Sequence, residues 1–113
     1  MRCEKKLQSY TYFRVCIDEG THVSPAGLSE LPHEVFPEGI KIDSEFFRAG
    51  TVVGNANWTD GHNEEAYADP EVFRPERWIS GEQTTVEEVS RIRAAFHPFS
   101  TGPFNCAGTI FAL

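Results

Sequence analysis

A cysteine between two glycines is the residue of this sequence best placed to do chemistry. Cys106 lies in the stretch FSTGPFNCAGTIFAL, residues 99–113, with Gly102 before it and Gly108 after it. The residues that follow begin a helix, and the amide groups and dipole of a helix N-terminus favour negative charge, so a cysteine there ionises more easily. A thiolate in this position serves as a nucleophile, a redox centre or a metal ligand.

A carboxylate and an imidazole three residues apart form a second candidate pair. The stretch SYTYFRVCIDEGTHVSP, residues 9–25, has apolar residues at helical spacing and is ended by Pro25. Glu19 and His22 are therefore neighbours on one face of this helix, and from spacing alone we expect an exposed polar pair. The expected buried stripe of the helix consists of Phe13, Cys16, Ile17, Gly20 and Val23.

Composition and charge narrow the classes of protein. A chain of 113 residues, 40% hydrophobic and 12% aromatic, suits one small domain with a core. The formal net charge of -7 argues against nucleic-acid binding and against a basic membrane surface, because both need clustered cations. The three cysteines and four histidines have neither disulfide nor zinc-knuckle spacing. Without a recognisable secretory signal or membrane-spanning stretch, the sequence indicates a soluble protein in a reducing compartment.

Short strand patterns follow the first helix. The prolines and glycines of residues 25–39 exclude a long helix there. IKIDSEFF, residues 40–47, has the alternation of a β-hairpin with its turn at Asp43-Ser44, although Ser44 stands where such turns prefer glycine. Residues 50–58 predict a second short strand.

One further helix precedes the cysteine segment. Residues 69–78, DPEVFRPERW, predict an irregular segment anchored by aromatic side chains. Residues 85–96 predict an amphipathic helix in which Thr85 and Glu88 form a capping box. The expected apolar face of this helix consists of Val86, Val89 and Phe96. A loop rich in proline and glycine then leads to the start of a last helix, so the predicted fold class is α+β.

Three short motifs lie in order along residues 7–113. The cysteine segment matches F-x-x-G-x-R-x-C-x-G at Phe99, Gly102, Cys106 and Gly108, with Phe104 in the arginine position.

The other two motifs lie upstream of that segment. EGTH, which runs from Glu19 to His22, matches E-x-x-R with histidine in place of arginine, and FRPERW contains P-E-R, which ends at Arg77. On these three motifs the chain resembles the C-terminal part of a cytochrome P450, the heme-thiolate monooxygenase family, and is most similar to fungal microsomal members. The resemblance implies one partial P450 domain over residues 1–113, with the K helix, small β-hairpins, meander, cysteine-ligand loop and start of the L helix.

The resemblance also implies roles for individual residues around a heme. Cys106 would be the proximal thiolate ligand to the iron, and Gly102 and Gly108 would let the backbone approach the porphyrin and the sulfur. Phe104 and His33 stand where the family has arginines that bind the heme propionates. The remaining cofactor-binding position is Phe99 of the loop motif.

A buried ion triad is implied by the same resemblance. It consists of Glu19, His22 and Arg77, with His22 in place of a guanidinium whose bidentate fork an imidazole cannot reproduce. In the family this triad holds the loop that carries the heme ligand.

At the level of the whole enzyme, the resemblance implies insertion of one oxygen atom of O2 into a small organic substrate. The cofactor would be heme b, and NADPH would supply electrons through a flavoprotein reductase. Full-length relatives are expected at the endoplasmic reticulum membrane, facing the cytoplasm. Leu28 and Leu31 would line part of the substrate pocket. The oxygen-activating helix of the family lies upstream of the matched part, so no catalytic residue is assigned here and we expect the chain alone to be inactive.

Alternatives to a heme-dependent enzyme remain at this point. The arginine positions occupied by other residues are compatible with a non-catalytic remnant or a small acidic interaction module. A structural zinc site built from Cys106 and histidines lacks ligand spacing. A cysteine nucleophile paired with His97 lacks an orienting acid and an oxyanion hole.

Overall fold

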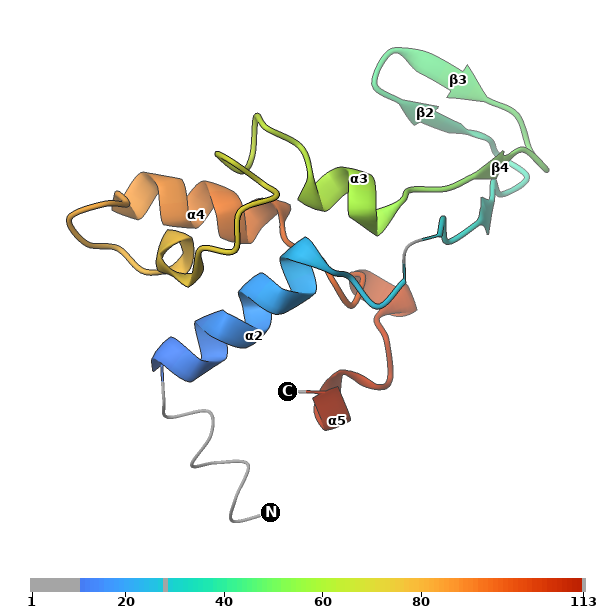
Figure 1. Cartoon of the computed structure of the whole chain (residues 1–113). Helices are drawn as coiled ribbons and strands as arrows, with labels where there is room; N and C mark the ends of the chain where they lie inside the picture. The colour runs from blue at the N-terminus through green and yellow to red at the C-terminus, as the bar shows by residue number, and fades with distance from the viewer. Residues whose placement is uncertain (1–10, 28, 113) are drawn as a thin grey trace.

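The computed structural model describes residues 11–27 and 29–112, as a small α+β unit in which helices pack together at one end and two antiparallel ribbons lie at the other (Figure 1). Its elements in chain order are α2 (Thr11–Val23), β1 (His33–Glu34), β2 (Ile40–Ile42), β3 (Glu45–Phe47), β4 (Val52–Val53), α3 (Asn57–Gly61), the 3-10 turn η1 (Pro75–Trp78), α4 (Val86–Ala95), the 3-10 turn η2 (Gly102–Phe104) and α5 (Thr109–Ala112). The predicted α+β class is confirmed.

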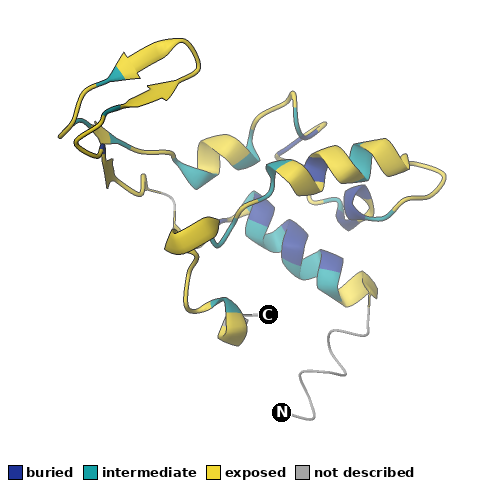
Figure 2. Cartoon of the chain, turned by 180° about the vertical axis from the view of Figure 1, so that it is seen from behind, coloured by how far each residue is buried: buried dark blue, intermediate teal, exposed yellow. Residues whose placement is uncertain are grey.

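The hydrophobic core lies where α2, η1 and α4 meet. Val15 of α2, Trp78 of η1 and Ile92 of α4 pack there together with Tyr67, which precedes η1. Figure 2 shows the buried residues gathered in these helical elements, whereas the β2–β3 ribbon is almost entirely exposed. The core therefore holds together the elements on either side of the P-E-R segment.

The helix predicted over residues 9–25 is confirmed for α2, but its predicted buried stripe is wrong. The buried residues of α2 are Val15, Asp18, Glu19 and His22. Phe13 is 48% exposed, and the other members of the expected stripe are only half-buried. The expected exposed pair of Glu19 and His22 is wrong for the same reason: polar partners on η1, directly before η1 and on α3 face this side of α2, so it becomes the interior.

The hairpin predicted over residues 40–47 is confirmed. Ile40 pairs with Phe47 and Ile42 with Glu45, which leaves Asp43 and Ser44 as the two-residue turn. Asp43, with φ of 53°, takes the left-handed conformation that aspartate tolerates better than most residues, so the turn does not depend on glycine at position 44.

The strand predicted over residues 50–58 is wrong in its second half. Only Val52–Val53 forms a strand, and it pairs antiparallel with His33–Glu34. Residues Asn57–Gly61 form the short helix α3 instead. The ring of Trp58 stacks on that of His62 one turn later, with centroids 4.1 Å apart, a contact that helical spacing allows and a strand does not.

The capping box predicted for the second long helix is confirmed. The Thr85 hydroxyl accepts the backbone N–H of Glu88, and the Glu88 carboxylate accepts that of Thr85. The predicted apolar face is wrong at Val86, which is exposed, because α4 meets the core through Ile92 near its C-terminal end.

Candidate functional site

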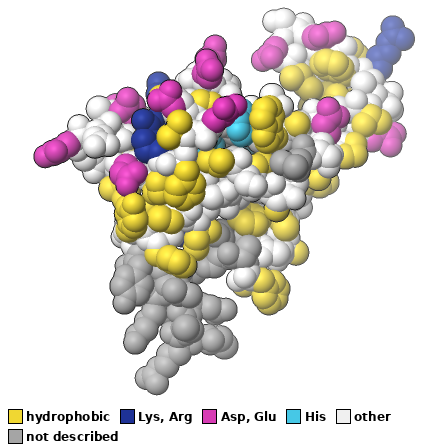
Figure 3. Space-filling view, viewed as in Figure 1, with side chains coloured by type: hydrophobic (Ala, Val, Ile, Leu, Met, Phe, Trp, Pro, Cys, Tyr) yellow, Lys and Arg dark blue, Asp and Glu magenta, His cyan; other side chains and the backbone are white. Residues whose placement is uncertain are grey.

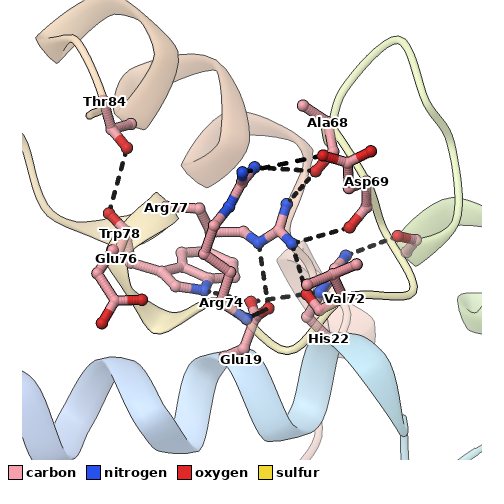
Figure 4. A network of polar contacts seen from close by, with 11 residues as sticks. Glu19, His22, Ala68, Asp69, Val72, Arg74, Glu76, Arg77, Trp78 and Thr84 are labelled. Atoms are coloured by element: carbon pink, nitrogen blue, oxygen red, sulfur yellow. Dashed lines mark hydrogen bonds and ion pairs between the residues drawn. The ribbon is translucent and has the colours of Figure 1, made fainter.

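The carboxylate of Glu19 is the centre of a buried polar network that joins α2 to η1 (Figure 4). Its side chain is 0% exposed. Oε1 accepts the Arg77 Nε–H at 3.1 Å and the backbone N–H of Arg74 at 2.6 Å, and Oε2 accepts the Trp78 indole N–H at 2.8 Å. Burial by itself raises the pKa of Glu19, but the neighbouring imidazole and the three donors outweigh burial and hold the pKa below its ordinary value. Glu19 is therefore an ionised anchor for the P-E-R segment.

The other N–H groups of the Arg77 guanidinium donate hydrogen bonds to backbone carbonyls. Nη1 donates to Ala68 O at 2.6 Å, and Nη2 donates to Asp69 O at 3.0 Å and Val72 O at 2.8 Å. The planar fork thus fastens the loop before η1 to the same carboxylate that holds α2. Because Arg77 is buried and every contact is internal, its arrangement is that of a clamp rather than of a group presented to a ligand.

His22 lies beside this pair without completing a hydrogen-bonded triad. Its Nε2 lies 2.6 Å from Gly61 O, and a carbonyl only accepts, so Nε2 carries a hydrogen and donates it. Nδ1 is 3.4 Å from Glu19 Oε2 and has no hydrogen-bond partner in acceptable geometry. His22 and Glu19 are consequently in close contact without a hydrogen bond, and the hydrogen bond from Nε2 of the His22 ring ties the end of α2 to α3.

The structure brings the three triad positions together, and sequence reasoning missed a fourth member, Trp78. Its indole N–H is the third donor to the Glu19 carboxylate. The position of Trp78 directly after Arg77 was the sequence feature that could have pointed to this contact. The rings of His22 and Tyr67 also face each other, with centroids 4.3 Å apart. Burial and the nearby Asp60 raise the pKa of Tyr67 to about 12, so its hydroxyl stays protonated in ordinary buffers.

The loop that carries Cys106 holds its shape through its own backbone. The Cys106 N–H donates to Phe99 O at 2.9 Å, and Thr109 donates to Cys106 O from both its N–H and its hydroxyl. Gly102, with φ of 66°, sits in the left-handed region that favours glycine. A Cβ at Gly108 would lie 3.4 Å from the Cys106 sulfur, at the near limit of ordinary van der Waals contact, so glycine leaves the space beside the thiol open.

The donor set around Cys106 fits a metal that brings most of its own ligands. Cys106 is exposed and free, and residues 11–27 and 29–112 contain no group of three His, Cys, Asp or Glu residues able to hold a metal ion. A structural zinc site needs about four protein ligands, whereas a porphyrin supplies four nitrogens of its own, so a heme would need as few as one protein ligand. In the described part of the chain, one exposed thiol beside glycines therefore suits heme better than a structural zinc ion.

The two expected propionate positions lie next to each other. His33 of β1 and Phe104 of η2 have ring centroids 5.2 Å apart with planes tilted by 59°, and both are exposed. The ring of Phe104 is apolar, so of these two residues only His33 can donate a hydrogen bond to an anionic group. This edge of the site fits a propionate less well than paired arginines would.

A cavity of about 480 Å³ lies between the end of α2, the β1–β4 ribbon and the start of the cysteine loop. Leu31, His33 and His97 line it, and Leu28 lies outside the described residues. His97 is exposed, and no hydrogen bond joins it to Cys106 among the described residues. The arrangement gives no support to a Cys106–His97 nucleophile pair.

No helix among the described residues is long and apolar enough to span a bilayer. Hydrophobic side chains are visible on the face of the molecule that carries α2 (Figure 3), and Tyr12 and Phe13 of this helix are exposed.

The comparisons with known proteins point to one family. The model of the family Cytochrome P450 matches residues 2–113. A cytochrome P450 monooxygenase, apf8 of Gibberella fujikuroi, is 39% identical over 108 residues, which are 95% of this chain and 29% of the relative. The monooxygenase oryQ of Aspergillus oryzae is 43% identical over 89 residues, 78% of this chain and 51% of the relative. The chain thus spans about half or less of these relatives.

Solved structures agree on the fold. A retinoic acid-bound cyanobacterial enzyme, CYP120A1, superimposes with a TM-score of 0.76 at 22% identity, over 96% of this chain and 23% of that one. A zebrafish cytochrome P450 with progesterone gives a TM-score of 0.70 at 23% identity, over 90% of this chain and 21% of that one. At these identities the likeness concerns the fold alone.

Proposed function

Because the chain belongs to the cytochrome P450 family, we propose that it forms the heme-ligating part of a monooxygenase, with Cys106 as the proximal ligand to the iron. The observation that carries this proposal is the exposed thiol of Cys106, a residue whose backbone N–H donates to the Phe99 carbonyl and whose sulfur lies beside Gly108. When bound, heme supplies the iron at which dioxygen is activated for insertion of one oxygen atom into an organic substrate.

The residues of this chain have supporting roles in that chemistry. Cys106 binds as a thiolate and donates electron density to the iron. Gly102 and Gly108 keep the backbone close to the macrocycle and the sulfur, and Phe99 fixes the cysteine through its carbonyl. His33 offers a ring N–H to a propionate, while Phe104 contributes an apolar contact.

Electron supply and substrate are proposed at the level of the family only. Electrons come from NADPH through a flavoprotein reductase, and the substrate is a small organic molecule. No residue of the described part is proposed to activate oxygen. For a whole enzyme that contains this segment, the endoplasmic reticulum membrane is the proposed location.

The ligand assignment is tested in a chimera. Residues 11–112 replace the matching segment of the Gibberella fujikuroi relative, and the reduced protein is treated with carbon monoxide. The thiolate-type absorption band is expected in the parent chimera, to be lost in Cys106→Ala and kept in Cys16→Ala, the matched control on α2. An unchanged band in Cys106→Ala refutes the assignment.

A non-catalytic role is the second candidate. The observation that favours it is the edge formed by His33 and Phe104, which offers one imidazole in place of two guanidinium groups. A chimera that folds but binds no heme, and regains heme when both positions are changed to arginine, supports this second candidate.

A further inference from the structure

We propose that Arg93 is a positioning residue for the Cys106 loop, because it fixes the end of α4 against η1 and α2. The link from this loop to iron ligation rests on the proposed function, but the placement of the loop is a property of the chain itself. Arg93 lies in the last turn of α4, and the chain leaves that helix directly into the cysteine segment (Figure 1).

The cysteine segment has few polar or aromatic contacts with the rest of the described residues. Among the described residues, every hydrogen bond made by residues 97–112 stays within that segment, from the Ser100 N–H on His97 O to the Phe111 N–H on Gly108 O. The ring of Phe104 against His33 is its one aromatic contact with the ribbons. The direction in which the loop leaves α4 is therefore set mainly at the helix end.

The guanidinium of Arg93 holds that end in three ways. Its Cζ lies 5.7 Å from the centroid of the Trp78 ring, within cation–π range. Its Nη2 donates to Trp78 O at 3.3 Å, and its Nη1 lies 3.9 Å from Asp18 Oδ2. The side chain is 50% exposed, so the ion pair alone is weak, and it is the planar fork over the ring that defines the geometry.

Trp78 connects this contact to the buried network. Its indole N–H is held by Glu19, and the ring of Phe96 meets it at a centroid distance of 4.6 Å with planes at 61°. The Phe96 N–H in turn donates to Arg93 O at 3.4 Å. Arg93 and Phe96 thus hold the same indole at the point where α4 becomes the loop.

Asp18 is the residue of α2 that Arg93 contacts, and it keeps a second cationic partner when Arg93 is removed. It is 5% exposed, and its carboxylate also pairs with Arg14 Nε at 3.1 Å. If Arg93 is removed, Asp18 keeps a cation, so a buried charge is not left alone and the core loses little. Removal of Arg93 should consequently loosen the loop more than it destabilises the core.

The test uses the 113-residue chain with a spin label on Cys106, in a background in which Cys3 and Cys16 are changed to serine. The variants are Arg93→Ala and Arg93→Lys, and the matched control is Arg91→Ala on the exposed side of the same helix. Label mobility is measured by electron paramagnetic resonance, and core stability by urea unfolding of the same samples. No heme is needed, so this result is independent of the outcome for the Cys106 ligand assignment.

Arg93→Ala is expected to raise the mobile fraction of the label by a factor of about five, the change that loss of an exposed cation–π contact corresponds to, at an unfolding midpoint close to that of the parent. Arg93→Lys should give an intermediate mobility, because the charge remains but the planar fork is lost. Arg91→Ala should leave both measurements unchanged. An immobile label in Arg93→Ala, or a loss of core stability that accounts for the extra mobility in both Arg93 variants, overturns the proposal.

Discussion

Replacing Glu19 with glutamine should remove a large part of the stability of this chain. The change keeps the shape of the side chain but deletes the charge that offsets Arg77 at 3.1 Å, in a site without solvent exposure. It also turns one of two acceptor oxygens into a donor, so that either the Trp78 indole or the Arg77 and Arg74 N–H groups face another donor. Leaving one member of a buried ion pair alone costs about 3–5 kcal/mol.

This cost should be visible as a shift of the urea unfolding midpoint. For a small protein, whose slope is about 1–3 kcal/mol per molar urea, the expected loss corresponds to a midpoint about 2 M lower. Far-ultraviolet circular dichroism reports the unfolding of α2 and α4. Glu87→Gln on the exposed first turn of α4 is the control, expected to change stability by less than about 0.5 kcal/mol. Equal midpoints for Glu19→Gln and its control would refute the view that this carboxylate anchors the network.

Three other outcomes are expected. The pKa of Glu19 is lowered in the folded chain, so its ionised carboxylate stabilises the fold fully above about pH 4.3, where unfolded glutamates titrate, and this stabilisation is lost as the pH falls through the lower folded pKa. Urea midpoints measured between about pH 3 and 7 should therefore drop in acid. The drop should be smaller in Glu19→Gln. His22→Arg in the chimera should raise the melting temperature and heme occupancy, because a guanidinium supplies the donor to Glu19 that Nδ1 of His22 does not; no gain in either measurement would mean that the site is adapted to histidine. The isolated 113-residue chain, with exposed Phe13 and Phe73, should bind hydrophobic dyes, retain little heme and hydroxylate nothing when given reductase and NADPH, whereas stoichiometric heme binding would contradict this.

The sequence by itself determined the features that depend on neighbours a few residues apart. The capping box of Thr85 and Glu88 and the turn at Asp43-Ser44 satisfy local backbone groups, and both are found where the pattern predicts them. Motif spacing also marked Glu19, Arg77 and Cys106 as a set, because the resemblance includes the order of the motifs as well as their residue types.

Only the tertiary structure decided which face of each helix is interior. Apolar periodicity placed Phe13 inside and Glu19 outside, yet the donors that make burial of Glu19 favourable come from Arg77 and Trp78, 58 and 59 residues away. A buried carboxylate is stable only where such donors converge, and no local pattern records them. The same holds for Arg93, whose side chain looks like one more surface charge until the fold places the Trp78 ring beneath it.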